Sequence, residues 1–255
     1  MYTIVQFSPT GNSAYVGKLL AEELHVEKLH ALEHTNPNSL EENGHLIILF
    51  AIHAFNAPST VKRFIKNLPK NKFEDVSLIG VGCNTSWINM AATKDIRRIL
   101  EKKSYKIVVD TVVAMPLTLV MSFPETLVQV QLNELNTIIK DISRDMRELV
   151  RTKKNIPFKT KIIQKVGYIE PYAAHLFGLE LHAKKSCTKC GLCVKECPEH
   201  NIRMNNNDKI KFGFKCMMCM RCIYNCPVNA ITPRISKFIP IKGGYSLDEY
   251  IERSE

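Results

Sequence analysis

Two copies of one cysteine pattern, near the C-terminal end, constrain this chain more than any other feature. In each copy three Cys residues stand three positions apart, a fourth follows four positions later, and a Pro comes directly after it (Pro198 and Pro227). Three thiolates on one tight loop can reach three irons of a cubane cluster, and the fourth iron must be ligated from elsewhere. The pattern therefore predicts two 4Fe-4S clusters. The first copy has Cys187, Cys190, Cys193 and Cys197, and the second has Cys216, Cys219, Cys222 and Cys226.

Zinc and disulfides are the competing explanations. Paired C-x2-C units can hold zinc, but zinc does not require the third Cys, the fourth Cys and the Pro in both copies. A disulfide scaffold requires an oxidising compartment. Residues 2–7 form an apolar run with none of the basic lead-in of a signal peptide, so we expect a cytoplasmic protein.

The cysteine segment resembles the bacterial 2×4Fe-4S ferredoxins, in which the fourth Cys of each run ligates the other cluster. The resemblance implies a small α+β ferredoxin-like domain over residues 181–236. It follows an expected basic linker at 151–180 and precedes a tail at 237–255. It also implies that Cys187, Cys190, Cys193 and Cys226 bind one cluster, and that Cys216, Cys219, Cys222 and Cys197 bind the other.

The first 150 residues alternate between strand and helix patterns. Apolar runs at 2–7, 45–52, 75–83 and 106–114 suit buried parallel strands, and 59–67, 90–103 and 125–150 suit helices. This alternation predicts an α/β domain with a doubly wound parallel sheet, in which ligands bind at the carboxyl ends of the strands.

The loop after the first strand is rich in hydroxyl groups and precedes an expected helix. Such a loop offers backbone N–H groups and hydroxyls to an anion at the helix N-terminus. It has neither the Lys-Ser/Thr pair of a P-loop nor a G-x-G-x-x-G motif. It resembles the phosphate loop of flavodoxins, and this resemblance implies that it holds the phosphate of FMN. The residues concerned are Ser8, Thr10, Gly11, Asn12 and Ser13.

Two further loops follow the next expected strands, at 53–58 and 83–89. In flavodoxins the matching loops hold the flavin ring with backbone groups and often stack an aromatic side chain on it. Phe55 and Trp87 are the aromatic candidates, although Trp87 serves equally well as packing. We favour capping of a strand for His53 and an inert thiol for Cys83. The ring contacts implied by the resemblance come from His53, Ala54, Phe55, Asn56, Asn84, Thr85 and Trp87.

The whole chain thus resembles the flavodoxin–ferredoxin fusion proteins of anaerobic bacteria and archaea. The resemblance implies an electron-transfer protein that relays electrons between FMN, two 4Fe-4S clusters and external redox proteins. A flavin-dependent reductase of a small molecule, fed through the clusters, and a sensor protein with an empty flavodoxin domain remain as alternatives. The sequence indicates no catalytic side chain.

The positive charge is concentrated in the second part of the chain. Residues 1–150 have 16 Lys+Arg and 16 Asp+Glu, whereas residues 151–255 have 19 and 9. Two ligated clusters would cancel roughly four of these charges, which weakens a nucleic-acid function. The basic run from Arg151 to Lys165 is either a solvated linker or a docking face for an acidic redox partner. No apolar stretch approaches the roughly 20 residues of a membrane span, and the oligomeric state is open.

Overall fold

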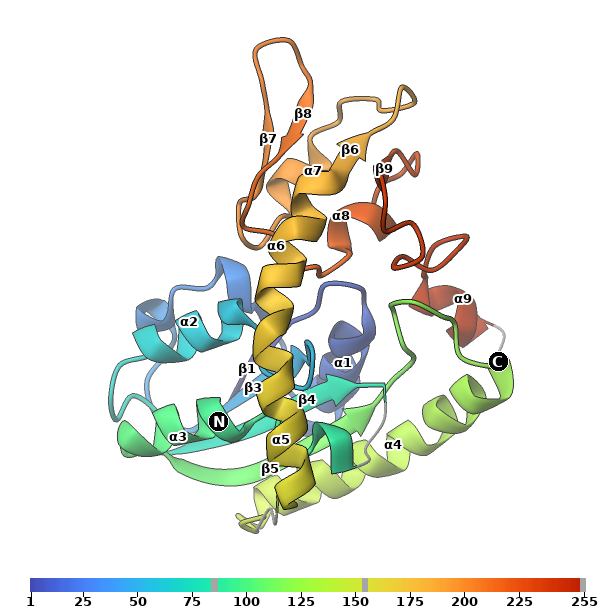
Figure 1. Cartoon of the computed structure of the whole chain (residues 1–255). Coiled ribbons are helices and arrows are strands. Elements are labelled where there is room, and N and C mark those ends of the chain that lie inside the picture. Colours follow the sequence, from blue (N-terminus) through green and yellow to red (C-terminus); the bar gives the residue numbers. More distant parts are fainter. Residues whose placement is uncertain (84–86, 153–155, 253–255) are drawn as a thin grey trace.

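A parallel five-stranded sheet organises the N-terminal part of the molecule (Figure 1). The computed structural model describes residues 1–83, 87–152 and 156–252. The strand order is β2-β1-β3-β4-β5 and all neighbouring pairs are parallel. This is the flavodoxin-like order of a doubly wound sheet, with the switch in strand order between β1 and β3. The strands are β1 (Tyr2–Phe7), β2 (Leu29–Ala31), β3 (His45–Ala51), β4 (Asp75–Gly82) and β5 (Lys106–Ala114).

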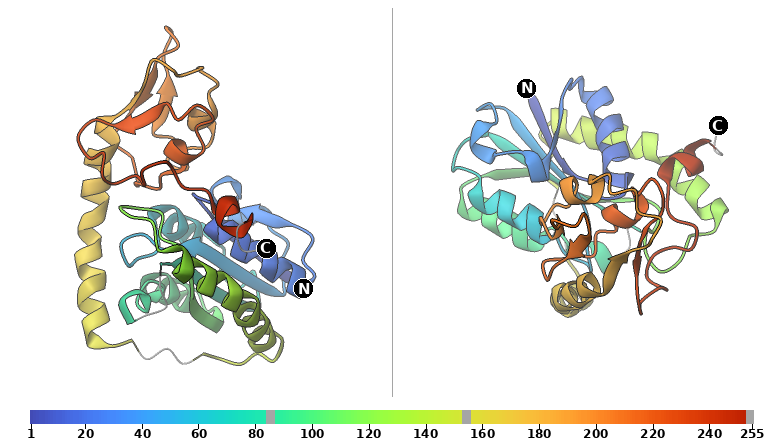
Figure 2. Two further views of the ribbon diagram at one scale, coloured as in Figure 1. Left: turned by 90° about the vertical axis from the view of Figure 1, so that its right-hand side faces the viewer. Right: turned by 90° about the horizontal axis from the view of Figure 1, so that it is seen from above.

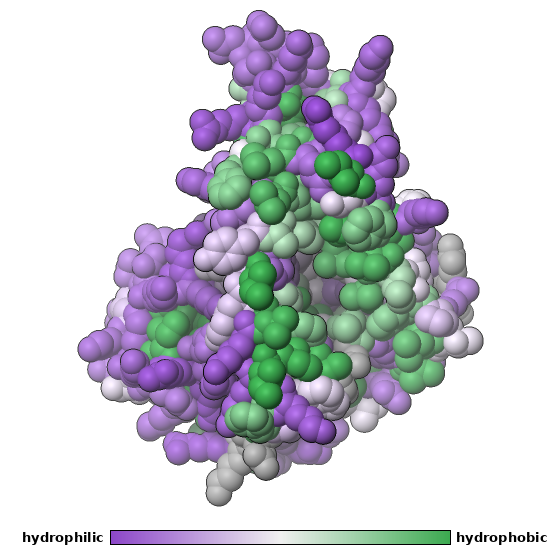
Figure 3. All heavy atoms as spheres, in the orientation of Figure 1, coloured by the Kyte–Doolittle hydropathy of each residue, from purple (hydrophilic) through white to green (hydrophobic). Residues whose placement is uncertain are grey.

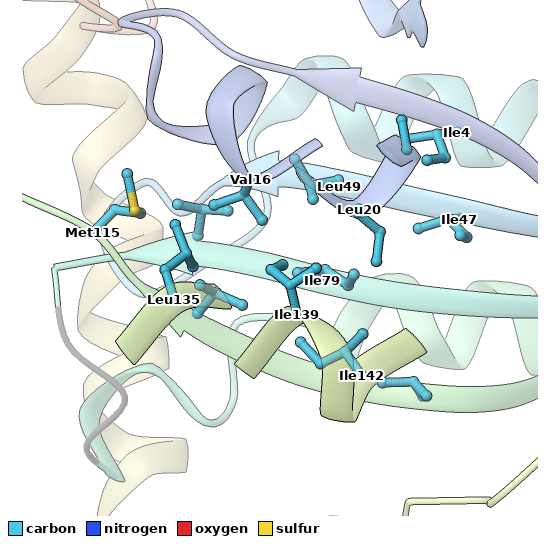
Figure 4. Packing of buried hydrophobic residues seen from close by; sticks show 14 of the residues in the cluster. Ile4, Val16, Leu20, Ile47, Leu49, Ile79, Met115, Leu135, Ile139 and Ile142 are labelled. Carbon is cyan, nitrogen blue, oxygen red and sulfur yellow. The ribbon is translucent and has the colours of Figure 1, made fainter. Parts of the chain in front are cut away.

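Helices cover both faces of the sheet. On one face α1 (Asn12–Leu24) and α4 (Glu125–Arg147) pack on the strands, and on the other face α2 (Ser59–Asn67) and α3 (Lys94–Lys102) do so. Strand β3 is buried along nearly its whole length because both faces are covered. Its side chains alternate between two cores, since successive strand residues point to opposite faces. Ile47 and Leu49 face α1 and α4 in the first core (Figure 4), whereas Leu46, Ile48 and Phe50 belong to the second.

The C-terminal part is a small α+β unit on a helical column. The column consists of α5 (Phe158–Val166), a 3-10 turn η4 (Gly167–Ile169) and α6 (Glu170–Glu180), which run end to end beside the sheet (Figures 1 and 2). The unit itself contains two antiparallel strand pairs, β6 with β9 and β7 with β8. Its elements are β6 (Leu181–Ala183), α7 (Leu192–Lys195), β7 (Ile202–Met204), β8 (Ile210–Phe212), α8 (Arg221–Tyr224) and β9 (Ile231–Pro233), and α9 (Leu247–Glu252) lies in the tail.

The segment expected as a basic linker carries two helices, of which α5 packs on the sheet domain and α6 packs on the α+β unit. Gly167 and Gly178 lie within the column, and each allows a close approach to a neighbouring segment. A Cβ atom at Gly167 would lie 1.9 Å from the carbonyl oxygen of Ala54, and one at Gly178 would lie 2.3 Å from the Cβ of Cys216. Pro171 occupies the first turn of α6, where its missing N–H costs no hydrogen bond.

The remaining differences from the expected elements are small. Strand β2 was not expected, because three partly exposed residues give too short a signal. Helix α3 is shorter than the expected 90–103, and the short turns η1 (Leu32–His34), η2 (Pro37–Ser39) and η3 (Trp87–Asn89) complete the sheet domain. None of the described helices has the length and apolar character needed to cross a membrane.

Glu199 and Met217 fix the α+β unit to the sheet domain. The Glu199 carboxylate accepts hydrogen bonds at 2.9 Å from the hydroxyls of Ser59 and Thr60 at the start of α2, and pairs with Arg63. An anion is favourable at a helix N-terminus. Met217 is buried in the core that contains α2. The two parts therefore pack against each other through a shared core.

The tail packs onto the first face of the sheet domain. Ile241, Tyr245 and Leu247 are buried in the core formed with α1 and α4. The Tyr245 hydroxyl bonds to the Asn12 side chain at the start of α1. The tail thus covers one side of the loop that follows β1.

Candidate cofactor sites

The eight cysteines of the repeat line two separate cavities in the α+β unit. One cavity is lined by Cys187, Cys190, Cys193, Cys222 and Cys226. The other is lined by Cys197, Cys216, Cys219 and Cys222. Each cavity combines three thiols of one run with the last thiol of the other, and Cys222 lines both cavities. Apart from Cys222, the two sets are those that the resemblance to two-cluster ferredoxins implies, and the assignment of each thiol to a cluster stays a prediction.

The backbone repeats along with the sequence. Left-handed conformations recur 29 positions apart, at Lys189 and Met218, at Gly191 and Met220, and at His200 and Asn229. Such conformations are uncommon for residues other than glycine. In both copies the N–H of the fourth residue after the last Cys donates to that sulfur, from Asn201 to Cys197 at 3.3 Å and from Ala230 to Cys226 at 3.2 Å. Hydrogen bonds of this kind tune cluster potentials.

The two cavities differ in their depth. Cys190 of the first cavity is exposed. Burial raises the pKa of Cys216 to about 11 and that of Cys219 to about 12, so free thiols there would stay protonated. A thiolate at these positions needs positive charge beside it, which the irons of a cluster supply. The donor set of the second cavity therefore fits a buried cluster.

The comparison with protein families decides the nature of this unit. Residues 180–227, which contain all eight cysteines, match the family model "4Fe-4S dicluster domain". This segment is similar to 4Fe-4S dicluster domains, and we call it the dicluster domain. The dicluster domain is also similar to the pyruvate synthase subunit PorD of Methanocaldococcus jannaschii, with 41% identity over 49 residues. That match covers 19% of this chain and 57% of PorD, so the chain spans little more than half the length of this relative.

A larger pocket lies at the carboxyl ends of the sheet strands, directly below the dicluster domain. Its volume is about 1020 Å³ including the part open to solvent. Loops after β1, β3, β4 and β5 form its floor and sides, and α6 contributes Glu170. Met218, Cys219 and Met220 of the dicluster domain form its roof. Cys219 therefore belongs both to the second cysteine cavity and to this pocket.

The loop after β1 reaches the pocket with Thr10 and Asn12. Ser8 instead caps α1, because its hydroxyl accepts the N–H of Ala14 at 2.8 Å. Gly11 has a φ of +98°, which suits glycine at this turn. The buried Ser13 hydroxyl has no hydrogen-bond partner among the described residues. The first turn of α1 contains no acidic side chain, so nothing there opposes an anion.

Asn12 is held on two sides. Its amide group donates to the carbonyl of Pro116 at 2.8 Å, and its oxygen accepts from Tyr245. The side chain therefore fixes the loop, and binding of a phosphate would fall to backbone N–H groups and Thr10. With its size, its position at the switch in strand order and its helix N-terminus, the pocket fits FMN.

The loop after β3 contributes His53, Ala54 and Phe55 to the pocket. Burial lowers the pKa of His53 to about 4, so the ring is neutral at pH 7. Asn56 turns away, and its amide group donates to the carbonyls of Ala54 and Gln164. It lines a neighbouring cavity under α6, to which His53 and Glu170 also contribute.

The loop after β4 contributes Cys83 to the pocket, where burial raises the thiol pKa. Asn84 and Thr85 lie outside the described residues. Trp87 is not among the residues that line the pocket. Its carbonyl accepts the hydroxyl of Thr160 on α5 at 2.7 Å, and its side chain is exposed. The described contacts of Trp87 are thus with the helical column.

Several pocket residues have no signal in the sequence. Glu170 and the roof residues come from parts of the chain that meet the sheet only in the folded protein. Residues 116–119, which follow β5, also line the pocket. Burial raises the pKa of Glu170 to about 7, which marks it as an unusual carboxyl group in this pocket.

Solved structures similar to the N-terminal part include flavodoxins. The flavodoxin of Streptococcus pneumoniae TIGR4 has a TM-score of 0.41 and 13% identity, covering 58% of this chain and 99% of its own. A flavodoxin from the domain Archaea has a TM-score of 0.39 and 12% identity, with the same coverages. The assignment of a flavodoxin-like fold rests on the strand order instead.

Proposed function

We propose that this protein is an electron carrier in which FMN and two 4Fe-4S clusters form one relay within a single chain. One observation carries the proposal. The pocket at the strand ends is lined by the loops of the flavodoxin-like sheet and also by Cys219 of the second cysteine cavity. A flavin in this pocket would lie directly against a cluster-binding loop. When bound, FMN exchanges one or two electrons and each cluster exchanges one.

The chain's own residues would position the groups and exclude water. The start of α1 would hold the phosphate through backbone N–H groups and Thr10. Met218 and Met220 would cover the flavin on the side of the dicluster domain. A covered ring favours electron transfer over reduction of a small molecule at the flavin face. We assign Cys187, Cys190, Cys193 and Cys226 to the outer cluster, and Cys197, Cys216, Cys219 and Cys222 to the inner one.

The outer cluster is the natural contact point for an external redox protein. Cys190 is exposed, and exposed basic side chains surround this end of the molecule. The exposed acid Asp208 is already paired with Lys189 at 3.7 Å. We therefore infer a partner with an acidic surface. The relative PorD is a pyruvate synthase subunit, which favours a larger oxidoreductase as this partner. The basic side chains are Lys184, Lys185, Lys189, Lys195, Arg203, Lys209 and Lys211.

Cofactor content tests the proposal first. Anaerobically purified protein should contain about eight irons and eight sulfides per chain, together with one FMN. Thr10→Asp places a negative charge in the pocket and should weaken FMN binding by about 10-fold or more. Ser39→Asp, which adds the same charge at an exposed site, should bind FMN normally. Eight irons without FMN, even after reconstitution, would refute the flavin half of the relay.

Flavin fluorescence tests the order of the groups. A cluster beside the flavin quenches its fluorescence by electron transfer, and a distant cluster does so much less. Cys197→Ser should remove the inner cluster and restore the fluorescence of bound FMN. Cys226→Ser should remove the outer cluster and leave the fluorescence quenched. Each variant should lose about four irons. Equal fluorescence in both variants would refute the proposed order.

A further inference from the structure

The outward face of the helical column carries an apolar stripe. Its members are 50% to 75% exposed, and the stripe runs down the front of the molecule (Figure 3). At 1.5 Å per residue the stripe is about 30 Å long. Isolated exposed apolar residues are ordinary, but a continuous patch of this length marks an interaction surface. The apolar stripe consists of Phe158, Ile162, Val166, Ile169, Tyr172, Leu176 and Leu179.

The opposite face of the same column is occupied by the protein itself. Thr160 and Gln164 are buried and bond to the carbonyls of Trp87 and Ala91. Phe177 is buried in the core of the dicluster domain. The column is therefore fixed against the body, and the apolar stripe is held rigidly toward the outside.

The spacing of the stripe suits packing against a second helix. Its seven members are separated by steps of three or four residues, and six steps span the 21 residues from Phe158 to Leu179. This mean spacing of 3.5 residues is typical of the apolar seam of a coiled coil, in which the side chains of one helix fill holes on another. Charged side chains stand beside it, among them Lys159, Lys161 and Glu180. A narrow seam with charged edges fits a helix better than it fits the broad apolar face expected of a membrane-surface helix.

The exposed area is also sufficient for a stable contact. With roughly 150–200 Å² per large side chain, the seven members offer on the order of 700 Å². A standard interface buries about 800 Å² per partner. The stripe by itself is thus close to the size that a specific dimer needs.

We propose that the apolar stripe is the interface of a homodimer, in which the columns of two copies pack antiparallel. Charge favours this direction. The lower half of the column carries Lys159, Lys161 and Lys165, whereas α6 above it carries no lysine or arginine. A parallel pair would bring the three lysines of both copies together, whereas an antiparallel pair keeps the two groups of lysines apart. A two-fold axis near Ile169, the middle of the stripe, would then place Ile162 of one copy beside Leu176 of the other.

Sedimentation of the anaerobically purified full-length protein tests the dimer. We expect a mass near twice the 29.1 kDa of the chain at micromolar concentration. Ile169→Lys combined with Leu176→Lys should weaken self-association by about 100-fold or more, because a lysine in the seam is buried without a partner. Leu127→Lys with Val130→Lys, two exposed positions on α4, should leave the dimer intact. Iron content and circular dichroism should match the unchanged protein in both variants.

Cross-linking with a short bismaleimide tests the direction. Ile162→Cys mixed with Leu176→Cys should give covalent dimers, and either variant alone should not. The two introduced thiols of an Ile162→Cys dimer would be about 20 Å apart. The unchanged protein, with Cys83 and its cluster thiols, is the control. Self-linking of Ile162→Cys would overturn the antiparallel arrangement.

Two other results would overturn the homodimer. One is a monomer at every concentration that binds vesicles of phosphatidylglycerol, which would assign the stripe to a lipid surface. The other is a monomer that does not bind such vesicles. None of these measurements depends on FMN, so they stand apart from tests of the relay.

Discussion

Arg221 joins the dicluster domain to the sheet domain through buried polar contacts. It lies between two cysteines of the second run, and only 6% of it is exposed. Its guanidinium donates to the carbonyls of Ser8 and Glu196 at 2.9 and 3.1 Å, and pairs with the buried carboxylate of Glu33. Loss of one member of a buried pair leaves the other charge without compensation, so removal of either side chain alone is costly.

We predict that Arg221→Met lowers the free energy of unfolding by about 3–5 kcal/mol, because Glu33 would remain buried and unpaired. Combining Arg221→Met with Glu33→Leu should restore much of this loss. Thermal unfolding of the anaerobic protein, followed by cluster absorbance and circular dichroism, measures both. A double variant as unstable as the single one would contradict the buried-charge explanation.

His45 predicts a dependence of stability on pH. Burial lowers its pKa to about 4, and its Nε2 lies 2.7 Å from the hydroxyl of Ser77. The folded protein keeps this ring neutral, whereas the unfolded chain binds a proton below its usual pKa of 6.5. The neutral His45 ring therefore contributes fully to the stability of the fold above pH 6.5, and this contribution is lost as the pH falls toward 4.

Between pH 7 and pH 5 we expect His45→Gln to lose less stability than the unchanged protein. Urea unfolding at several pH values gives the two slopes. His34→Gln, at an exposed position, should keep the original slope. Identical slopes for His45→Gln and the unchanged protein would show that another group carries the dependence.

At the scale of elements, the helical column depends on two glycines that let it approach its neighbours. The backbone of Gly167 is in a right-handed helical conformation, so Ala should be favourable there on local grounds. The carbonyl of Ala54 leaves no room for its methyl group, however. The tertiary contact thus makes Ala unfavourable at position 167, where helix propensity alone would favour it.

Gly167→Ala should destabilise the protein by about 1–3 kcal/mol, the usual cost of overpacking. It should also increase amide exchange in α5 and in the 53–58 loop, which loses its packing. Lys165→Ala, at an exposed site on the same helix, is the control and should change little. A stabilised Gly167→Ala protein would mean that the column does not pack as described.

For the molecule as a whole, the uneven charge predicts how it meets redox partners. The end beside the outer cavity is basic, so an anionic oxidant such as ferricyanide should react quickly with the reduced clusters at low salt. The rate should fall several-fold between low and physiological ionic strength, because salt screens exposed charges. Stopped-flow absorbance of the clusters measures it.

A charge-reversed variant sharpens this prediction. Lys184→Glu with Lys185→Glu should slow ferricyanide and weaken its salt dependence, while a cationic cobalt(III) hexaammine should become faster. Lys18→Glu with Lys28→Glu, on the sheet domain, should alter neither rate substantially. Equal effects from both pairs would show that only net charge matters and would remove the argument for docking at the outer cluster.

The sequence by itself determined the elements and the chemistry that depend on local order. The spacing of the eight cysteines by itself predicted two 4Fe-4S clusters, and the family match to residues 180–227 supports this prediction. Long apolar runs located β1, β3, β4 and β5, because strands buried on both faces carry a continuous signal. Loop 8–13 was recognised because a strand and a helix adjoin it directly.

Only the tertiary structure decided what lies against these elements. Residues 151–180 were expected to form a linker, yet Gly167 and Gly178 allow the column to pack closely against its neighbours. The roof of the strand-end pocket comes from Met218 to Met220, more than 100 residues beyond the strands it covers. Periodicity reports which face of an element is apolar, but not which distant segment will cover it. The exposed stripe of the column shows the same limit, since its spacing predicts a helical partner that this chain alone does not supply.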